Sequence, residues 1–152
     1  MGSHLHIHGT WRLVSWVVEV IETSEQIRQF GDDPPGFIHF TPEGRVFAVL
    51  TASGRKPVEK EADQVAAFGS LIAYAGRYRV DGNKLVTTVE VSADPGAVGT
   101  DLIRFFNLEG DTLEIKTAPF FSEKPNLGLG GKQLQSFLIW KRIENGHGGN
   151  PG

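Results

Sequence analysis

The chain of 152 residues contains no cysteine. Disulfide bonds and thiolate metal sites are therefore excluded, and the composition favours a reducing compartment. A net charge of -3 with interspersed signs offers no basic surface for nucleic acid or an anionic membrane. No apolar run reaches the roughly 18 residues that a membrane span requires, and the N-terminus lacks a signal-peptide pattern. We expect a soluble, cytoplasmic, single-domain protein without nucleic-acid or membrane partners.

Three histidines, His4, His6 and His8, alternate near the N-terminus and would share one face of an extended strand. A zinc site built on them would need a further protein ligand from elsewhere in the chain. The opening Met-Gly-Ser-His looks like a cloning scar. We therefore expect no metal, and we interpret residues 1–8 as scar and leader. Residues 144–152 have no apolar anchor and are expected to form a disordered tail.

Alternating apolar and polar residues, rich in valine, isoleucine and aromatic side chains, predict β-strands along most of the chain. Turn residues separate nine such segments: 11–21, 26–30, 36–41, 45–52, 73–80, 84–92, 101–108, 112–117 and 133–143. One amphipathic helix is predicted over residues 58–72, and Gly69 favours an end near Ser70.

Short links between consecutive strands indicate an antiparallel meander, and a sheet of this length avoids exposed edges by closing on itself. The fold class predicted for residues 9–143 is all-β, a closed up-and-down barrel of about eight to nine strands. Such a barrel has room inside for one small ligand. The helix at 58–72 is expected to plug or cover one mouth. The aperiodic loop 118–132 is an alternative cover that could gate a ligand.

Specific segments resemble a known family. Gly9-Thr10-Trp11 resembles the glycine-x-tryptophan signature of lipocalin and calycin barrels. The segments GTWRLVS, PPGFIHFTPEGRV, AYAGRYRVDGN and VEVSADPGAVGTDLIRFF, in this order, are similar to microbial intracellular lipocalin-like domain proteins. The resemblance implies that Trp11 packs at the closed end against a basic residue of the last strand, Lys141 or Arg142. The chain lacks the disulfide and C-terminal helix of secreted lipocalins, so their transport roles are not carried over.

Polar side chains that point into an apolar barrel mark either a hydrogen-bonded network or a ligand site. Arg104 shares a strand face with Leu102 and Phe106, and Glu90 on the preceding strand is expected to lie close to it. Their ion pair would be structural or exposed. Alternatively, Arg104 would hold a carboxylate, phenolate or enolate of a bound molecule, oriented by Glu90.

The strand histidine and the two tyrosines each allow a catalytic and a structural interpretation. His39 could act as a general acid or base, or be a normal strand histidine. Tyr74 and Tyr78 could polarise a carbonyl or be core aromatics with a satisfied hydroxyl. The candidate catalytic set is His39, Tyr78, Glu90 and Arg104. The candidate ligand-binding set consists of aromatic side chains: Trp16, Phe37, Phe47, Tyr74, Phe106, Phe120 and Trp140.

Three functions fit these features. The first is a module, monomeric or homodimeric, that binds a small hydrophobic or aromatic molecule inside the barrel. The second is a cofactor-independent isomerase, cyclase or lyase acting on a polyketide-like or terpenoid-like substrate. The third is an interaction protein that pairs through a strand edge. No cofactor is expected, and haem binding would require an axial ligand such as His39.

Overall fold

The computed structural model describes residues 7–121 and 130–143. The predicted strands are all present, with ends shifted by a few residues, and the 118–132 loop contributes one further short strand. The elements in chain order are β1 (Gly9–Val20), β2 (Glu25–Ile27), β3 (Gly36–Phe40), β4 (Arg45–Thr51), α1 (Glu61–Gly69), β5 (Leu71–Asp81), β6 (Lys84–Ser92), the 3₁₀ helix η2 (Pro95–Ala97), β7 (Asp101–Glu109), β8 (Thr112–Lys116), β9 (Phe120–Phe121) and β10 (Gln133–Arg142).

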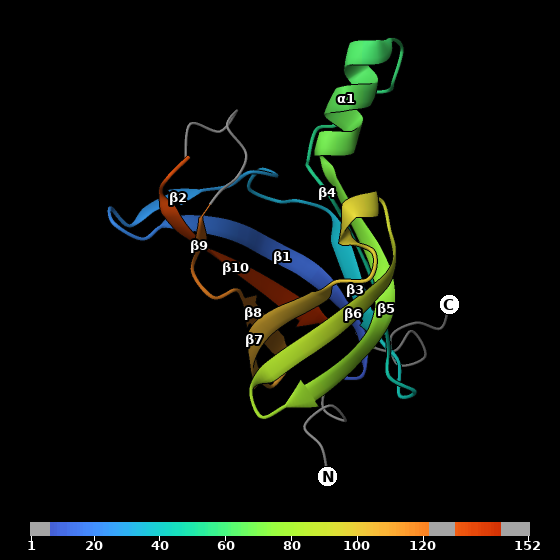
Figure 1. The fold of residues 1–152 in the computed structure, drawn as a ribbon, viewed down its shortest axis with the longest axis vertical. Coiled ribbons are helices and arrows are strands. Elements are labelled where there is room, and N and C mark those ends of the chain that lie inside the picture. Colours follow the sequence, from blue (N-terminus) through green and yellow to red (C-terminus); the bar gives the residue numbers. More distant parts are fainter. Residues whose placement is uncertain (1–6, 122–129, 144–152) are drawn as a thin grey trace.

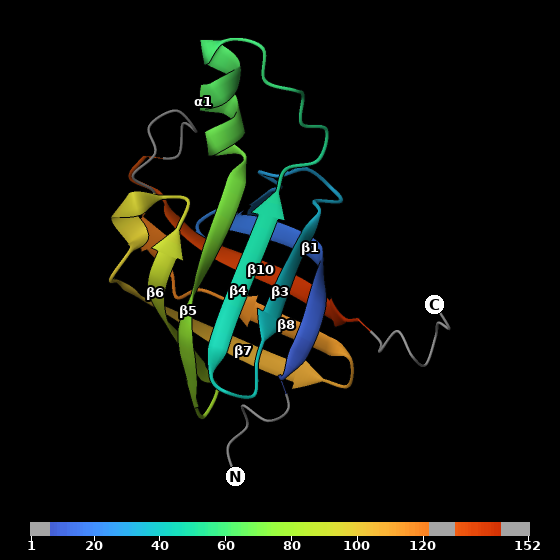
Figure 2. The ribbon, with the colours of Figure 1, turned by 90° about the vertical axis from the view of Figure 1, so that its right-hand side faces the viewer.

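Eight of the strands form a closed antiparallel barrel, which confirms the predicted fold class (Figures 1 and 2). The barrel order is β1-β3-β4-β5-β6-β7-β8-β10. It closes because β1 pairs with β10, from Trp11 opposite Arg142 to Val20 opposite Leu134. The short strands β2 and β9 add to β1 and β10 respectively. Closure pairs the backbone of the edge strands and leaves an enclosed interior.

The end of the barrel near Trp11 is filled by side chains. Trp11 and Phe40 are fully buried there, and the indole Nε1 of Trp11 donates to the carbonyl oxygen of Ile7 at 2.9 Å. Tyr78 packs edge-on against Phe40, with ring centroids 5.0 Å apart. Ile7, which the sequence placed in the leader, is itself 0% exposed. This end is therefore closed, and any opening must lie at the other end.

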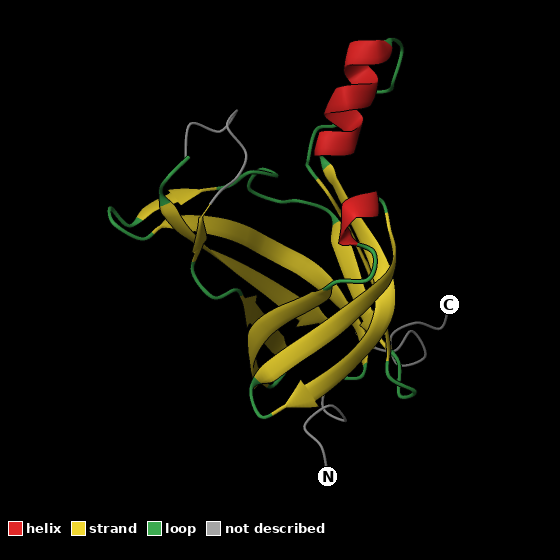
Figure 3. Ribbon diagram, in the orientation of Figure 1, coloured by secondary structure: helices red, strands yellow, loops and turns green. Residues whose placement is uncertain are grey.

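The helix α1 does not plug the barrel. It is shorter than predicted and ends at Gly69, as the glycine suggested, but it projects beyond the strands next to the start of β5 (Figures 1 and 3). None of its residues is buried, and Val65 is 75% exposed. The expectation that residues 58–72 cover a mouth is wrong. Only the C-terminal end of α1, at Phe68 and Gly69, borders the barrel opening.

Candidate functional site

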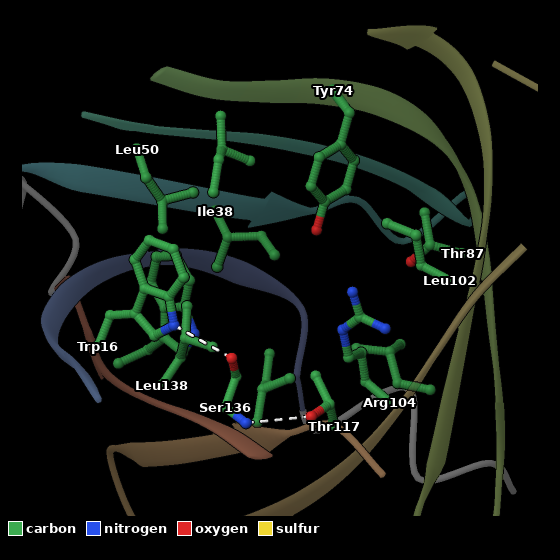
Figure 4. Close-up of a pocket in the computed structure, with 14 residues that line it drawn as sticks. Trp16, Ile38, Leu50, Tyr74, Thr87, Leu102, Arg104, Thr117, Ser136 and Leu138 are labelled. Atoms are coloured by element: carbon green, nitrogen blue, oxygen red, sulfur yellow. Dashed lines mark hydrogen bonds between the residues drawn. The ribbon is translucent and has the colours of Figure 1, made fainter. Parts of the chain in front are cut away.

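A cavity of about 130 Å³, which we call the chamber, lies inside the barrel (Figure 4). Inward side chains of five strands form most of its apolar wall: Ile38, Leu50, Leu85, Ile115, Leu138 and Trp140. They face inward because alternate residues of a strand point to the same side of the sheet. The chamber exists because these side chains do not meet across the barrel as Trp11, Phe40 and Tyr78 do at the closed end.

A second cavity of about 300 Å³, which we call the vestibule, adjoins the chamber on the side of α1 and η2. The two share the residues Trp16, Ile72, Tyr74, Leu102 and Arg104. These five side chains form a neck between an inner chamber and an outer space.

Arg104 and Tyr74 face each other across this neck. Arg104 lies on β7 opposite Leu85 of β6, and Figure 4 shows its guanidinium and the Tyr74 hydroxyl pointing into the same space. The guanidinium donates to the carbonyl oxygen of Ile103 at 3.0 Å, and no described carboxylate forms a salt bridge with it. Burial lowers the pKa of Arg104, and the nearby Tyr74 opposes this effect. Burial likewise raises the pKa of Tyr74, and the charge of Arg104 opposes that rise.

Further hydrogen-bonding groups line the chamber wall. The Trp16 indole donates to the Ser136 hydroxyl at 3.3 Å, and the Ser136 backbone N–H donates to the Thr117 hydroxyl at 3.1 Å. Thr87 is buried and also lines the chamber. The indole N–H of Trp140 is buried without a hydrogen-bond partner among the described residues. The chamber is thus apolar in most of its wall but carries several polar groups.

The comparison with known families agrees with this geometry. Residues 8–143 match the family described as the lipocalin-like domain. The chain belongs to the lipocalin-like domain family. Among curated proteins, none matches the sequence significantly. The tryptophan contact that the resemblance implied is also present in this lipocalin-like barrel, since the Arg142 guanidinium carbon lies 4.2 Å from the centre of the Trp11 ring. Of the two basic candidates, Arg142 makes this contact.

The predicted proximity of Glu90 and Arg104 is wrong. The carboxylate of Glu90 instead forms salt bridges on the outer surface with Arg45 at 2.5 Å and Arg77 at 3.1 Å. The cause is the pairing of β6 with β7, which places Arg104 opposite Leu85 rather than Glu90. Leu85 lines the chamber, and Glu90, five residues later, lies on the other face of β6 because successive residues alternate. Glu90 therefore does not orient Arg104.

The pairing of β5 with β6 has a register irregularity between Ala75 and Gly76, where the two backbones approach closely. A Cβ atom at position 76 would lie 1.9 Å from the carbonyl oxygen of Thr88, which no real side chain tolerates. Glycine is required here because the backbones approach more closely than a side chain allows. The close approach of β5 and β6 at this point therefore depends on glycine at position 76.

His39, Phe37 and Phe47 do not line the chamber, contrary to the prediction. Phe37 and Phe47 are 46% and 52% exposed, and with His39 they border an apolar groove on the outer surface of β3 and β4. The His39 Nδ1 lies 2.7 Å from the Thr10 hydroxyl. Their neighbours Ile38 and Phe40 take the inward positions, because inward and outward residues alternate. His39 therefore does not fit as an axial ligand for haem in the chamber.

Three further predicted residues, Tyr78, Phe106 and Phe120, line neither the chamber nor the vestibule. The Tyr78 hydroxyl donates to the Thr41 carbonyl oxygen at 2.9 Å, so Tyr78 is a satisfied core aromatic away from the chamber. Phe106 packs against the core without lining either cavity, and Phe120 is 38% exposed on β9. The middle of the predicted gating loop, like His4, His6 and the C-terminal tail, lies outside the described residues.

The prediction placed Trp16, Tyr74, Arg104 and Trp140 at the site, and all four line the chamber. It missed the polar residues Thr87 and Ser136. Ser136 could have been found, since it lies two and four residues before Leu138 and Trp140 on one strand face. Within the described residues there is no group of three or more acidic or histidine side chains suited to a metal ion, and no helix long and apolar enough to cross a membrane.

Proposed function

We propose that this protein binds a small hydrophobic or aromatic molecule inside its barrel. The observation that supports the proposal is an apolar chamber inside the barrel that adjoins the vestibule and shares with it five lining residues, among them Tyr74 and Arg104. An engineered apolar cavity of about 150 Å³ is large enough to bind benzene. A chamber of about 130 Å³ therefore has a size suited to about one aromatic ring.

The expected affinity requires contacts in both cavities. A ring that buries about 150 Å² of apolar surface gains roughly 4 kcal/mol, and association costs offset part of this gain. Micromolar binding needs about 8 kcal/mol, so a ligand confined to the chamber would bind weakly. We expect the physiological ligand to extend from the chamber into the vestibule, past Trp16 and Phe30, whose rings pack edge to face at 4.7 Å.

Fluorescence titration with N-phenyl-1-naphthylamine, a neutral apolar probe, tests the proposal. The substitution Leu102→Trp places a bulky ring in the neck, whereas Ile103→Trp places the same ring at the next position of β7, where the side chain is 47% exposed. We expect saturable binding to the unmodified protein and to Ile103→Trp, and a loss of at least tenfold in affinity for Leu102→Trp. Absence of saturable binding to the unmodified protein would contradict the proposal, as would equal binding by both variants.

A second candidate function is cofactor-independent isomerase, cyclase or lyase chemistry on a polyketide-like or terpenoid-like substrate. The observation that favours it is a tyrosine hydroxyl beside a guanidinium in a partly dry space, an arrangement that can stabilise an enolate. His39 and Glu90 lie on the outer surface, so Tyr74 and Arg104 would stabilise the enolate oxygen, and hydroxide from solvent would take the α-proton. Deuterium exchange at C2 of 1-tetralone, followed by NMR, tests this. Exchange unaffected by the unmodified protein would count against it, and exchange accelerated by that protein but not by Arg104→Met would support it.

A further inference from the structure

Arg104 is the one charged residue among the described residues that line the chamber. The vestibule adds one acidic residue, Asp94, on its outer side. A guanidinium has five N–H donors, and the structure shows one of them used, in the bond to the Ile103 carbonyl oxygen. Arg104 is therefore a cation on the chamber wall, and its other N–H groups have no hydrogen-bond acceptor among the described residues.

Three other arginines of the barrel strands differ from Arg104 in this respect. Arg45 and Arg77 pair with Glu90 on the outer surface, and Arg142 pairs with Asp111 at 3.4 Å. An unpaired charge that is removed from water is costly, so a protein gains little stability by keeping one inside a barrel. A ligand with a negative charge would give Arg104 the partner that the described residues do not provide.

We infer that the ligand is an acid whose carboxylate or phenolate oxygen binds at the neck, between the Arg104 guanidinium and the Tyr74 hydroxyl. This inference rests on the proposed function and narrows it. Arg104 and Tyr74 line both cavities, so an anion held by them sits where the apolar part of the ligand can extend inward, outward or both ways. Burial keeps the Tyr74 hydroxyl protonated at neutral pH, and it can therefore donate a hydrogen bond to the anion.

The volume of the chamber limits the size of the group that the ligand can carry next to its carboxylate or phenolate. Its volume of about 130 Å³ accepts a single aromatic ring. The ligand class is therefore an aromatic acid, with one ring in the chamber and any larger portion in the vestibule.

The test measures how well 4-ethylbenzoate and 4-ethylbenzamide displace N-phenyl-1-naphthylamine. The two competitors have nearly the same shape and differ in charge. The unmodified protein should prefer the benzoate at least tenfold, in the range of roughly 10- to 100-fold that one charge-assisted contact provides. Arg104→Met should remove this preference, and Arg104→Lys should retain part of it. The control Arg79→Met removes an exposed, outward-facing arginine of β5 and should leave the preference unchanged.

The possible outcomes distinguish the proposal of binding inside the barrel from the inference that the ligand is an acid. If the neutral probe itself does not bind saturably, barrel binding fails. If the probe binds but the benzamide competes as well as the benzoate, the inference of an acidic ligand is overturned while barrel binding stands. The same holds if folded Arg104→Met retains the preference. Should that variant not fold, Tyr74→Phe carries the test, and an unchanged preference there overturns the role of the hydroxyl.

Discussion

Arg104→Met is expected to make the protein more stable. Burial lowers the pKa of the guanidinium, which means that the folded environment disfavours its charge. Methionine keeps an unbranched side chain of similar reach and packs well in apolar surroundings. The effective cost of desolvating an ion is several kcal/mol. The vestibule and the bond to the Ile103 carbonyl oxygen compensate most of that cost for Arg104, so we expect a net gain of about 1–2 kcal/mol.

Urea unfolding, followed by the fluorescence of the three tryptophans, measures this gain. The midpoint should rise without a change in the denaturant slope, and Tm should rise by roughly 2–4 °C per kcal/mol for a chain of this size. The control Arg79→Met should stay within about 0.5 kcal/mol of the unmodified protein. At ten times its Kd, 4-ethylbenzoate should stabilise the unmodified protein by about 1.4 kcal/mol and the Arg104→Met variant by much less.

A loss of stability greater than about 1 kcal/mol in Arg104→Met would refute this reasoning. It would show that the guanidinium holds the barrel together, and a structural role would then explain its position without any ligand. If Arg104→Met is instead more stable and no longer prefers 4-ethylbenzoate over 4-ethylbenzamide, Arg104 serves ligand binding and lowers the stability of the unliganded protein.

Three further predictions follow from the fold. Gly76→Ala should lower the free energy of unfolding by more than about 3 kcal/mol, because a Cβ there meets the Thr88 carbonyl oxygen; chemical denaturation showing a loss below 1 kcal/mol would contradict this. Absorbance at 295 nm should show both tyrosines, Tyr74 and Tyr78, ionising above the ordinary pH of about 10, since burial raises both pKa values. Their contribution to stability is complete below pH 10 and declines above it, so half-ionisation of the folded protein at pH 10 would refute the assignment. Glu90→Gln should change stability by less than about 1 kcal/mol and leave probe binding unaltered, because its salt bridges are exposed; loss of binding would return Glu90 to the site.

Local pattern predicted the strands well because alternation is a property of each segment alone. It also placed Arg104 on the same face as Leu102, and the structure confirms that both line the chamber. The resemblance of Gly9-Thr10-Trp11 to the lipocalin signature implied a contact of Trp11 with Lys141 or Arg142, and the structure shows it with Arg142. The strands and the sharing of a strand face can be predicted without knowing how distant strands pair.

Residue type alone was a poor guide to the inward face. Phe37 and Phe47 were assigned to the ligand site as aromatics, yet both lie outside, next to the inward positions 38 and 46. Irregular pairing adds to the difficulty. In β1, a register shift between Leu13 and Ser15 allows both Leu13 and Trp16 to face the interior, although residues three positions apart in a regular strand lie on opposite faces.

The sequence by itself determined the strands, the closed barrel class and the family, since these depend on alternation, turn residues and short motifs. Only the tertiary structure decided that Glu90 pairs outward with Arg45 and Arg77, that α1 projects from the barrel, and that Arg104 meets Tyr74 at the neck. The physical reason is register. A shift of one residue between paired strands moves a side chain from one face to the other, and it is set by contacts between segments far apart in the chain.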